Sequence, residues 1–231
     1  MLVSAQARVV CVARPRGPMH SYRLSDEFFL IGHDEFTGKP AINRELIACG
    51  LSAALLAELM ISGQLGMQDG RVTLLDTAPT GELVSDQVLE LVGQQRKEHT
   101  VRTWTEHLGD PAYELVARRL VDEGVVRREE ARRMLGRSPE RFPPVNLYQA
   151  ARARLWLGHM ITHPLEMDLQ RTISAGLVTA VGVERVLGIE LDSQQIRDIV
   201  AERVSQLPAD LQSLLGGVSA AVAALSLTIR R

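Results

Sequence analysis

The apolar stretch between Asn43 and Gly63 constrains the fold more than any other part of the sequence. Asn43 is a favourable N-cap, Glu45 follows in the first turn, and Gly63 is a natural stop after the last apolar turn. Apolar residues recur between these ends at helical spacing: Leu46, Ile47, Gly50, Leu51, Ala54, Leu55 and Leu59. Because most residues from Ala48 to Ala54 are small, neighbouring helices can approach closely. The pattern predicts a helix at the centre of a packed helical domain.

The composition agrees with a helical protein and excludes one class of partner. Apolar residues make up 45% of the chain but aromatic residues only 4%, and such an aliphatic interior suits packed helices. The formal charge of −2 excludes a general nucleic-acid binder, which needs a concentrated cationic surface. Any anion binding must therefore come from a local patch. The two cysteines, Cys11 and Cys49, lack metal-ligand spacing, which favours a reducing cytoplasm.

Two local signals flank this central segment. The triplet Ser25-Asp26-Glu27 is an acidic N-cap signature before Phe28-Phe29-Leu30-Ile31, so we predict an element that begins at this triplet. Asp69-Gly70 stands between two short apolar runs and predicts a β-hairpin within residues 65–75.

The rest of the chain is expected to be mostly helical. We predict helices over 85–92, 100–108, 112–124, 147–161, 164–187, 194–204 and 211–229. Pro111 is expected to open the helix at 112, with Asp110 as its cap. The sequence contains no fixed-period repeat and no linker-like change of composition, so it predicts one globular domain.

Both ends of the chain admit two interpretations. Residues 1–23 have no acid and contain four arginines: Arg8, Arg14, Arg16 and Arg23. Their apolar stretches are short, so we interpret them as a disordered or loosely packed basic leader rather than a targeting segment. Residues 211–229 carry no charge and approach the ~20 residues that span a bilayer. Their apolarity is modest, and we predict a buried helix of the bundle instead.

No catalytic template is present in the sequence. The chain lacks Gly-x-Ser-x-Gly, a Walker loop, HExxH and G-x-G-x-x-G. His159 and His163 are one helical turn apart, but Glu166 is the only further ligand nearby and Pro164 interrupts the helix. We therefore predict a protein without catalytic residues, metal or cofactor.

An arginine-rich run admits both a structural and a functional interpretation. Its arginines lie within one short stretch: Arg127, Arg128, Arg132, Arg133, Arg137 and Arg141. Three glutamates lie among them, and such a mixture of positive and negative residues is typical of a surface that is exposed to solvent. Alternatively, the guanidinium groups form a surface that faces an anion, since they bind phosphate in a bidentate way and reach out at membrane surfaces.

The order of several motifs resembles the Golgi phosphoprotein 3 family, in particular its bacterial, actinobacterial-type members. The matching segments run from about Leu24 to the C-terminus: LSDEFFL at 24–30, GLSAALLAEL at 50–59 with Gly63 after it, PTG at 79–81, TVRTW at 100–104 and LVDEGVV at 120–126. The resemblance implies a mainly α-helical domain over residues 24–231. It further implies a central helical bundle, surrounding amphipathic helices and a protruding β-hairpin, which we place across Val126–Asn146.

The resemblance also implies a function. Eukaryotic members are peripheral adaptors that bind phosphatidylinositol 4-phosphate, recruit proteins to Golgi membranes and self-associate through the hairpin. Their head group is held by one tryptophan and three arginines. Alignment of the motifs places these on Asn43 and Ser52, and near Asp110 and Tyr113, so none is retained. Arg44 and Arg118 are the nearest basic substitutes.

Two functional hypotheses follow. The first is a cytoplasmic, non-catalytic, peripheral membrane protein at the inner face of the membrane, which binds an anionic phospholipid or phosphoinositide head group. The alternative is a soluble helical module that has lost lipid binding and recruits a protein partner. An enzyme is the third and weakest hypothesis.

Overall fold

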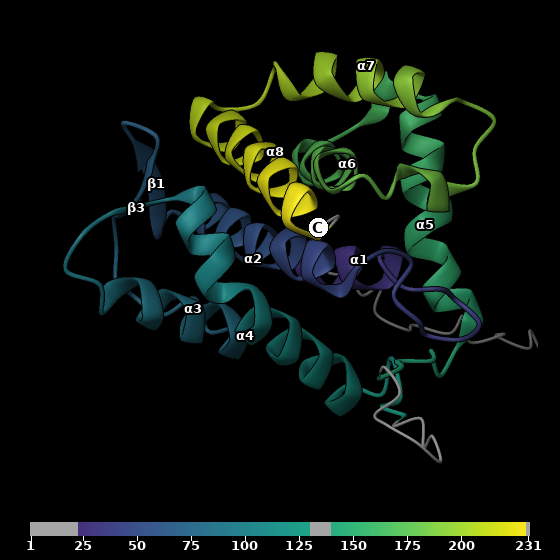
Figure 1. Cartoon of the computed structure of the whole chain (residues 1–231), viewed down its shortest axis with the longest axis horizontal. Coiled ribbons are helices and arrows are strands. Elements are labelled where there is room, and N and C mark those ends of the chain that lie inside the picture. The colour runs from purple at the N-terminus through teal and green to yellow at the C-terminus, as the bar shows by residue number, and fades with distance from the viewer. Residues whose placement is uncertain (1–22, 130–139, 230–231) are drawn as a thin grey trace, which may run out of the picture.

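The computed structural model describes residues 23–129 and 140–229. Eight helices form the body, with one small antiparallel sheet at one end (Figure 1). The helices are α1 (Leu24–Ile31), α2 (Arg44–Ile61), α3 (Leu83–Gly93), α4 (Val101–Asp122), α5 (Leu147–Thr162), α6 (Leu169–Val181), α7 (Ser193–Val204) and α8 (Ala209–Ile229). Two short 3-10 helices are η1 (Pro164–Glu166) and η2 (Glu184–Leu187). The mainly α-helical single domain predicted from the sequence is thus confirmed.

Helix α2 is the centre of the fold, as predicted. Asn43 caps it, and α1, α3, α4, α6 and α8 all pack against it. Its small residues permit this crowding. A Cβ atom on Gly50 would lie only 2.3 Å from the Phe28 ring of α1, so α1 can cross α2 this closely only over a glycine.

Helix α1 begins earlier than the sequence signature predicted. Its first residue is Leu24 and its cap is Arg23, so Ser25-Asp26-Glu27 lies inside the first turn and the N-cap prediction is wrong. Every residue of α1 is buried. Its two carboxylates are paired instead, Asp26 with Arg119 of α4 and Glu27 with Arg171 of α6. The acidic residues of the first turn therefore form ion pairs with other helices instead of capping α1.

Helix α4 is continuous through Pro111, so the predicted break into two helices is also wrong. Proline removes one backbone hydrogen bond and crowds the preceding turn, which usually breaks a helix. Here buried side chains on both sides of the proline, including Trp104, Leu108, Val116 and Leu120, anchor the helix in the core. The free energy gained by this packing outweighs the cost of placing a proline inside the helix.

The predicted hairpin at 65–75 is confirmed. Strands β1 (Leu65–Gln68) and β2 (Arg71–Leu74) pair antiparallel around Asp69 and Gly70, which both have positive φ, as a type I′ turn requires. A third strand, β3 (His99–Thr100), adds to β2 and was not predicted. The sheet order is β1-β2-β3.

The single helix predicted over 164–187 is three elements in the structure: η1, α6 and η2. Asp168 caps α6 by accepting the backbone N–H of Arg171, and Gly182 ends it with a left-handed φ of 81°. These cap and stop signals divide the apolar run. Helix α6 then lies between α2, α7 and α8.

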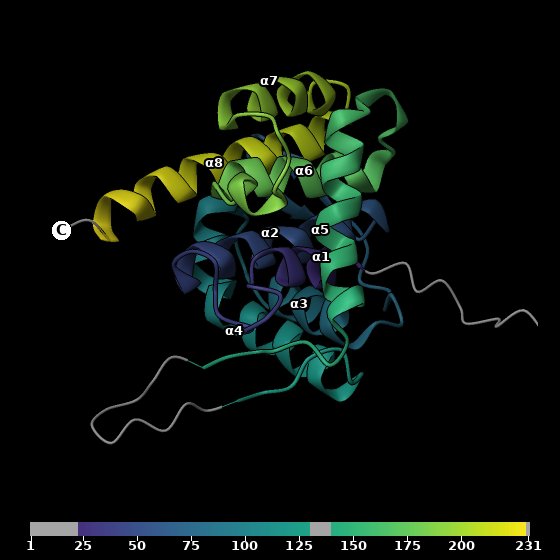
Figure 2. The same cartoon turned by 90° about the vertical axis from the view of Figure 1, so that its right-hand side faces the viewer.

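Helix α8 is a core helix up to about Val222 and not over its last turns. Leu211, Leu214, Leu215 and Val218 are buried, whereas Leu227 is largely exposed. The C-terminal end projects beyond the body (Figure 2). Among the described residues, α8 is the one helix long and apolar enough to cross a membrane, and 33% of that window is buried within the fold. The predicted buried helix therefore holds for the part that meets α2 and α6.

The base of the second predicted hairpin is present between α4 and α5. Val126 bridges Pro144 and Glu129 bridges Arg141, both antiparallel. The rest of the predicted Val126–Asn146 hairpin, including Arg132, lies outside the described residues, as does the basic leader up to residue 22.

Candidate head-group site

The structure places Arg44 against α4, where its charge is already paired. Its guanidinium lies 4.1 Å from the centre of the Tyr113 ring and donates to the carboxylates of Asp110 and Glu114, the latter at 2.9 Å. Burial favours loss of the Arg44 proton, but the hydrogen bond and charge of Asp110 outweigh it and raise the pKa. An anion at this position would have to displace two carboxylates.

The other aligned positions do not open toward a ligand. Asn43 uses its side chain to cap α2, with Oδ1 accepting the N–H of Glu45 at 2.7 Å. Ser52 is fully buried, and its hydroxyl donates to a backbone carbonyl one turn earlier in α2. Arg118 is exposed beside Asp122 and lines a different hollow, together with Arg23. The structure therefore brings Arg44, Asp110 and Tyr113 together and leaves Ser52 and Arg118 apart from them.

Tyr113 belongs to a buried aromatic cluster with His33, Phe29 and Phe142. The His33 Nδ1–H donates to the backbone carbonyl of Phe29 at 2.7 Å, so Nε2 accepts from the Tyr113 hydroxyl, also at 2.7 Å. Burial raises the pKa of Tyr113 and lowers that of His33 to about 4. Both side chains are thus neutral components of the core, and His33 was not identified from the sequence.

We expect His33 to make the fold acid-sensitive. The pKa of His33 in the folded protein lies below the ordinary value of 6.5. Between these two pKa values the unfolded chain therefore binds a proton at His33 that the folded chain does not bind. Stability therefore falls as the pH drops from about 6.5 toward 4, by up to about 3 kcal/mol at roughly 1.4 kcal/mol per pH unit. Urea denaturation at several pH values measures this loss.

The variant His33→Gln supplies the comparison, because its amide does not titrate. Asp26, Glu27 and Glu58 have pKa values raised by burial, and they give the opposite slope in both proteins. The difference between the two proteins therefore isolates His33. Parallel curves between pH 7 and 4.5 would contradict the assignment.

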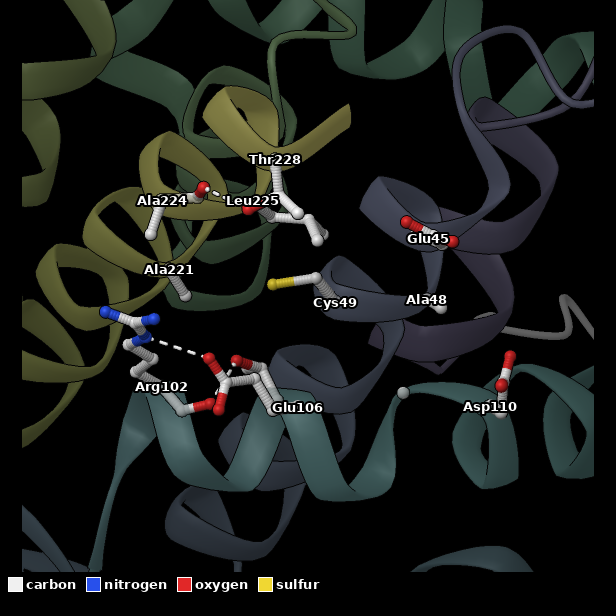
Figure 3. A pocket seen from close by; sticks show the side chains of 12 residues that line it. Glu45, Ala48, Cys49, Arg102, Glu106, Asp110, Ala221, Ala224, Leu225 and Thr228 are labelled. Carbon is white, nitrogen blue, oxygen red and sulfur yellow. Dashed lines mark hydrogen bonds and ion pairs between the residues drawn. The ribbon is translucent and has the colours of Figure 1, made fainter. Parts of the chain in front are cut away.

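A pocket of about 290 Å³ opens beside Asp110, between α2, α4 and α8 (Figure 3). Its floor is small and apolar, with Ala48 and Cys49 from α2 and Ala221 and Ala224 from α8. Sequence reasoning missed this pocket, because only the packed fold brings the end of α8 to the start of α2. Burial raises the pKa of the Cys49 thiol, which makes it a poor nucleophile.

The rim of this pocket is acidic. Glu45, Glu106 and Asp110 line it, whereas Arg102 is its one cationic residue among those described and is paired with Glu106 at 2.8 Å. Glu45 has no ion-pair partner in the described part of the chain. The field at the pocket mouth therefore disfavours phosphate.

The arginines at the hairpin base differ from one another. Arg128 donates to Glu114 and Glu140 and lies 5.7 Å above the Phe142 ring. Arg127 is exposed and has no ion-pair partner among the described residues. Arg141 pairs through its backbone with Glu129. The remaining predicted members of this surface, Arg132, Arg133 and Arg137, lie outside the described residues.

Ion pairs connect the hairpin base to the head-group position. Asp110, Arg44, Glu114, Arg128 and Glu140 follow one another as alternating charges across α2, α4 and the hairpin. The sequence contains one indication of this row of ion pairs. Asp110 and Glu114 are four residues apart, so they lie on one helix face and can both bind a cation from another element.

The sequence model of the family described as Golgi phosphoprotein 3 (GPP34) matches residues 24–225. The match covers all eight helices except the last turn of α8.

Proposed function

The chain belongs to the Golgi phosphoprotein 3 family, and we propose that it acts as a non-catalytic binding protein that attaches peripherally to anionic membranes on their cytoplasmic face. The observation that carries the proposal is Arg127 at the hairpin base, which is exposed and has no ion-pair partner within residues 23–129 and 140–229. Arg132, Arg133 and Arg137 add further charge in the same hairpin sequence. Each cation near an anionic surface contributes about 1 kcal/mol of attraction.

The proposed attachment does not depend on one phosphoinositide. Arg44 is held by Asp110 and Glu114, and the neighbouring pocket has an acidic rim. A phosphate would lose the two or three charge-assisted bonds that selective recognition needs, each contributing about 1.5–3 kcal/mol. We therefore expect phosphatidylinositol 4-phosphate to attract the protein no more than other lipids of matched charge.

A soluble protein-interaction module is the second candidate. The observation that favours it is the same closure of the head-group position by Arg44, which removes the site through which eukaryotic relatives are expected to recognise lipid. Absence of binding to any anionic vesicle at low salt would select this candidate.

Charge reversal on the hairpin tests the first candidate. Arg127→Glu combined with Arg132→Glu removes two cations, which weakens binding to phosphatidylglycerol-containing vesicles by about thirtyfold at about 1 kcal/mol per charge. The added repulsion increases this loss. Co-sedimentation at low salt measures it, and the binding of the wild type falls as salt rises.

The matched control is Arg96→Glu with Lys97→Glu. Both residues are exposed in the α3–β3 loop, at the opposite end of the molecule from the hairpin base (Figure 1). The control has the same net charge as the test variant. Equal weakening by the two variants would show that net charge, not the hairpin, decides binding.

A further inference from the structure

We infer that one face of α5 enters the headgroup region of the anionic membrane, an inference that rests on the proposed peripheral attachment. This α5 face comprises Tyr148, Arg152, Leu155, Trp156 and His159. Helix α5 lies on the side of the molecule that faces the viewer in Figure 2, and the hairpin base leads directly into it. The membrane-contacting surface is thus the α5 face together with the exposed Arg127 at the hairpin base, rather than the head-group position beside Arg44.

The α5 face is apolar and aromatic where a surface helix is normally polar. Tyr148 is 77% exposed, Leu155 65% and Trp156 47%. The positions follow helical spacing and cover one arc, while the opposite arc, with Ala153 and Leu157, is buried. Large side chains of this kind rarely gather on the solvated face of a monomer without an interaction to serve.

The charge on this face is of one sign. The sequence from Arg141 to Leu165 contains no aspartate or glutamate. Arg154 is already paired with Glu35 at 2.6 Å, whereas Arg152 is exposed and has no ion-pair partner among the described residues. An anionic lipid surface supplies the negative charge that this part of the chain lacks, and therefore complements the α5 face.

The residue types match the boundary between water and lipid. Tryptophan and tyrosine concentrate there because each has an apolar ring and a polar end, and arginine reaches from apolar surroundings to the head groups. Exposed Val145 and Leu147 continue the apolar surface toward the hairpin base. The described hairpin base and the α5 face are therefore consecutive along the chain.

A second copy of the chain fits this surface less well. A symmetric contact through the α5 face would bring both copies of Arg152 into one interface, with no carboxylate on α5 to compensate. The anionic membrane relieves that repulsion, and a dimer does not.

The two tryptophans allow a direct test. Trp104 is 2% exposed in the core, and Trp156 is the half-exposed one. The variant Trp104→Phe reports on Trp156 alone, and Trp156→Phe reports on Trp104 alone. Vesicles of phosphatidylglycerol and chain-brominated phosphatidylcholine are expected to quench Trp156 and shift its emission to shorter wavelength, with Trp104 unaffected. If Trp104→Phe does not fold, the wild-type signal minus that of Trp156→Phe gives the same information.

Affinity gives an independent measurement. Leu155→Ser with Trp156→Ser is expected to weaken vesicle binding at least tenfold, because two large apolar side chains no longer leave water. The matched control is Leu75→Ser with Leu83→Ser, two exposed leucines beside the sheet and on α3, which should leave binding unchanged.

The outcomes separate this inference from the proposed function. Co-sedimentation with unquenched Trp156 would overturn the role of α5 and leave hairpin attachment intact. Failure of the wild type to co-sediment overturns both. A shift of Trp156 emission with protein concentration in the absence of vesicles would show that a second copy covers the face, which also overturns the inference.

Discussion

Replacing Arg119 by methionine is expected to destabilise the protein by about 3–5 kcal/mol, because the change leaves buried acids without their cation. Arg119 is 8% exposed; its guanidinium binds Asp26, which is 2% exposed, and lies 2.9 Å from Glu82. It also donates to the Ser25 hydroxyl at 2.8 Å. Urea denaturation at neutral pH measures the loss.

The loss should depend on pH. Burial raises the pKa of Asp26, and the charge of Arg119 opposes that shift. Without the arginine the folded-state pKa rises further above the unfolded value, so the penalty is present at high pH and is relieved as the pH falls through that raised pKa. The variant Asp26→Asn should rescue part of the loss at neutral pH.

The neighbouring arginine is the control. Arg118→Met removes an exposed side chain whose distance to Asp122 is 3.9 Å, and such surface pairs contribute about 0–1 kcal/mol. Similar destabilisation by both substitutions would show that the buried network around Asp26 is not what matters.

Replacing Gly38 by alanine is expected to cost about 3 kcal/mol or more. Gly38 has a φ of 63°, and a Cβ there would lie 2.1 Å from the backbone of both Phe142 and Pro143. The backbone cannot yield as a side-chain tip can, so the 33–40 loop and the hairpin base must separate. The hydrogen bond from Phe142 N–H to the Gly38 carbonyl, 2.8 Å long, should then be lost.

Gly124→Ala separates steric conflict from backbone strain. Gly124 has a φ of 68°, but nothing lies within 4 Å of a Cβ placed there. Only the left-handed conformation is penalised, by roughly 1–2 kcal/mol. Hydrogen exchange at Phe142 should increase in Gly38→Ala alone, and equal effects in the two variants would refute the close contact.

The sequence predicted those elements whose signals are local and consistent. Asn43 and Gly63 mark α2 with an independent cap and stop, and Asp69-Gly70 allows few structures other than a hairpin turn. The predictions at Pro111 and Ser25-Asp26-Glu27 failed because the deciding partners are distant in the chain. The core beneath α2 holds α4 straight past its proline, and Arg119 is 93 residues from Asp26.

The candidate site could be predicted only in part. The resemblance grouped six residues at one position: Asn43, Arg44, Ser52, Asp110, Tyr113 and Arg118. The structure brings Arg44, Asp110 and Tyr113 together and leaves Ser52 and Arg118 apart from them. The resemblance could not show that Arg44 faces two acids rather than an anion, or that His33 holds the Tyr113 hydroxyl, because both depend on side-chain direction. The α5 face had a sequence signal, aromatic and cationic residues at helical spacing in an acid-free segment, that was not used.

The row of alternating charges from Asp110 to Glu140 has a thermodynamic consequence. Arg128 and Arg44 share the carboxylate of Glu114. If an anion binds Arg128 and breaks its ion pair with Glu114, Glu114 pairs with Arg44 alone. The ion pair between Glu114 and Arg44 then becomes stronger. An anion bound at Arg128 would therefore oppose the entry of an anion beside Tyr113, and by reciprocity an anion beside Tyr113 would lower the affinity at Arg128.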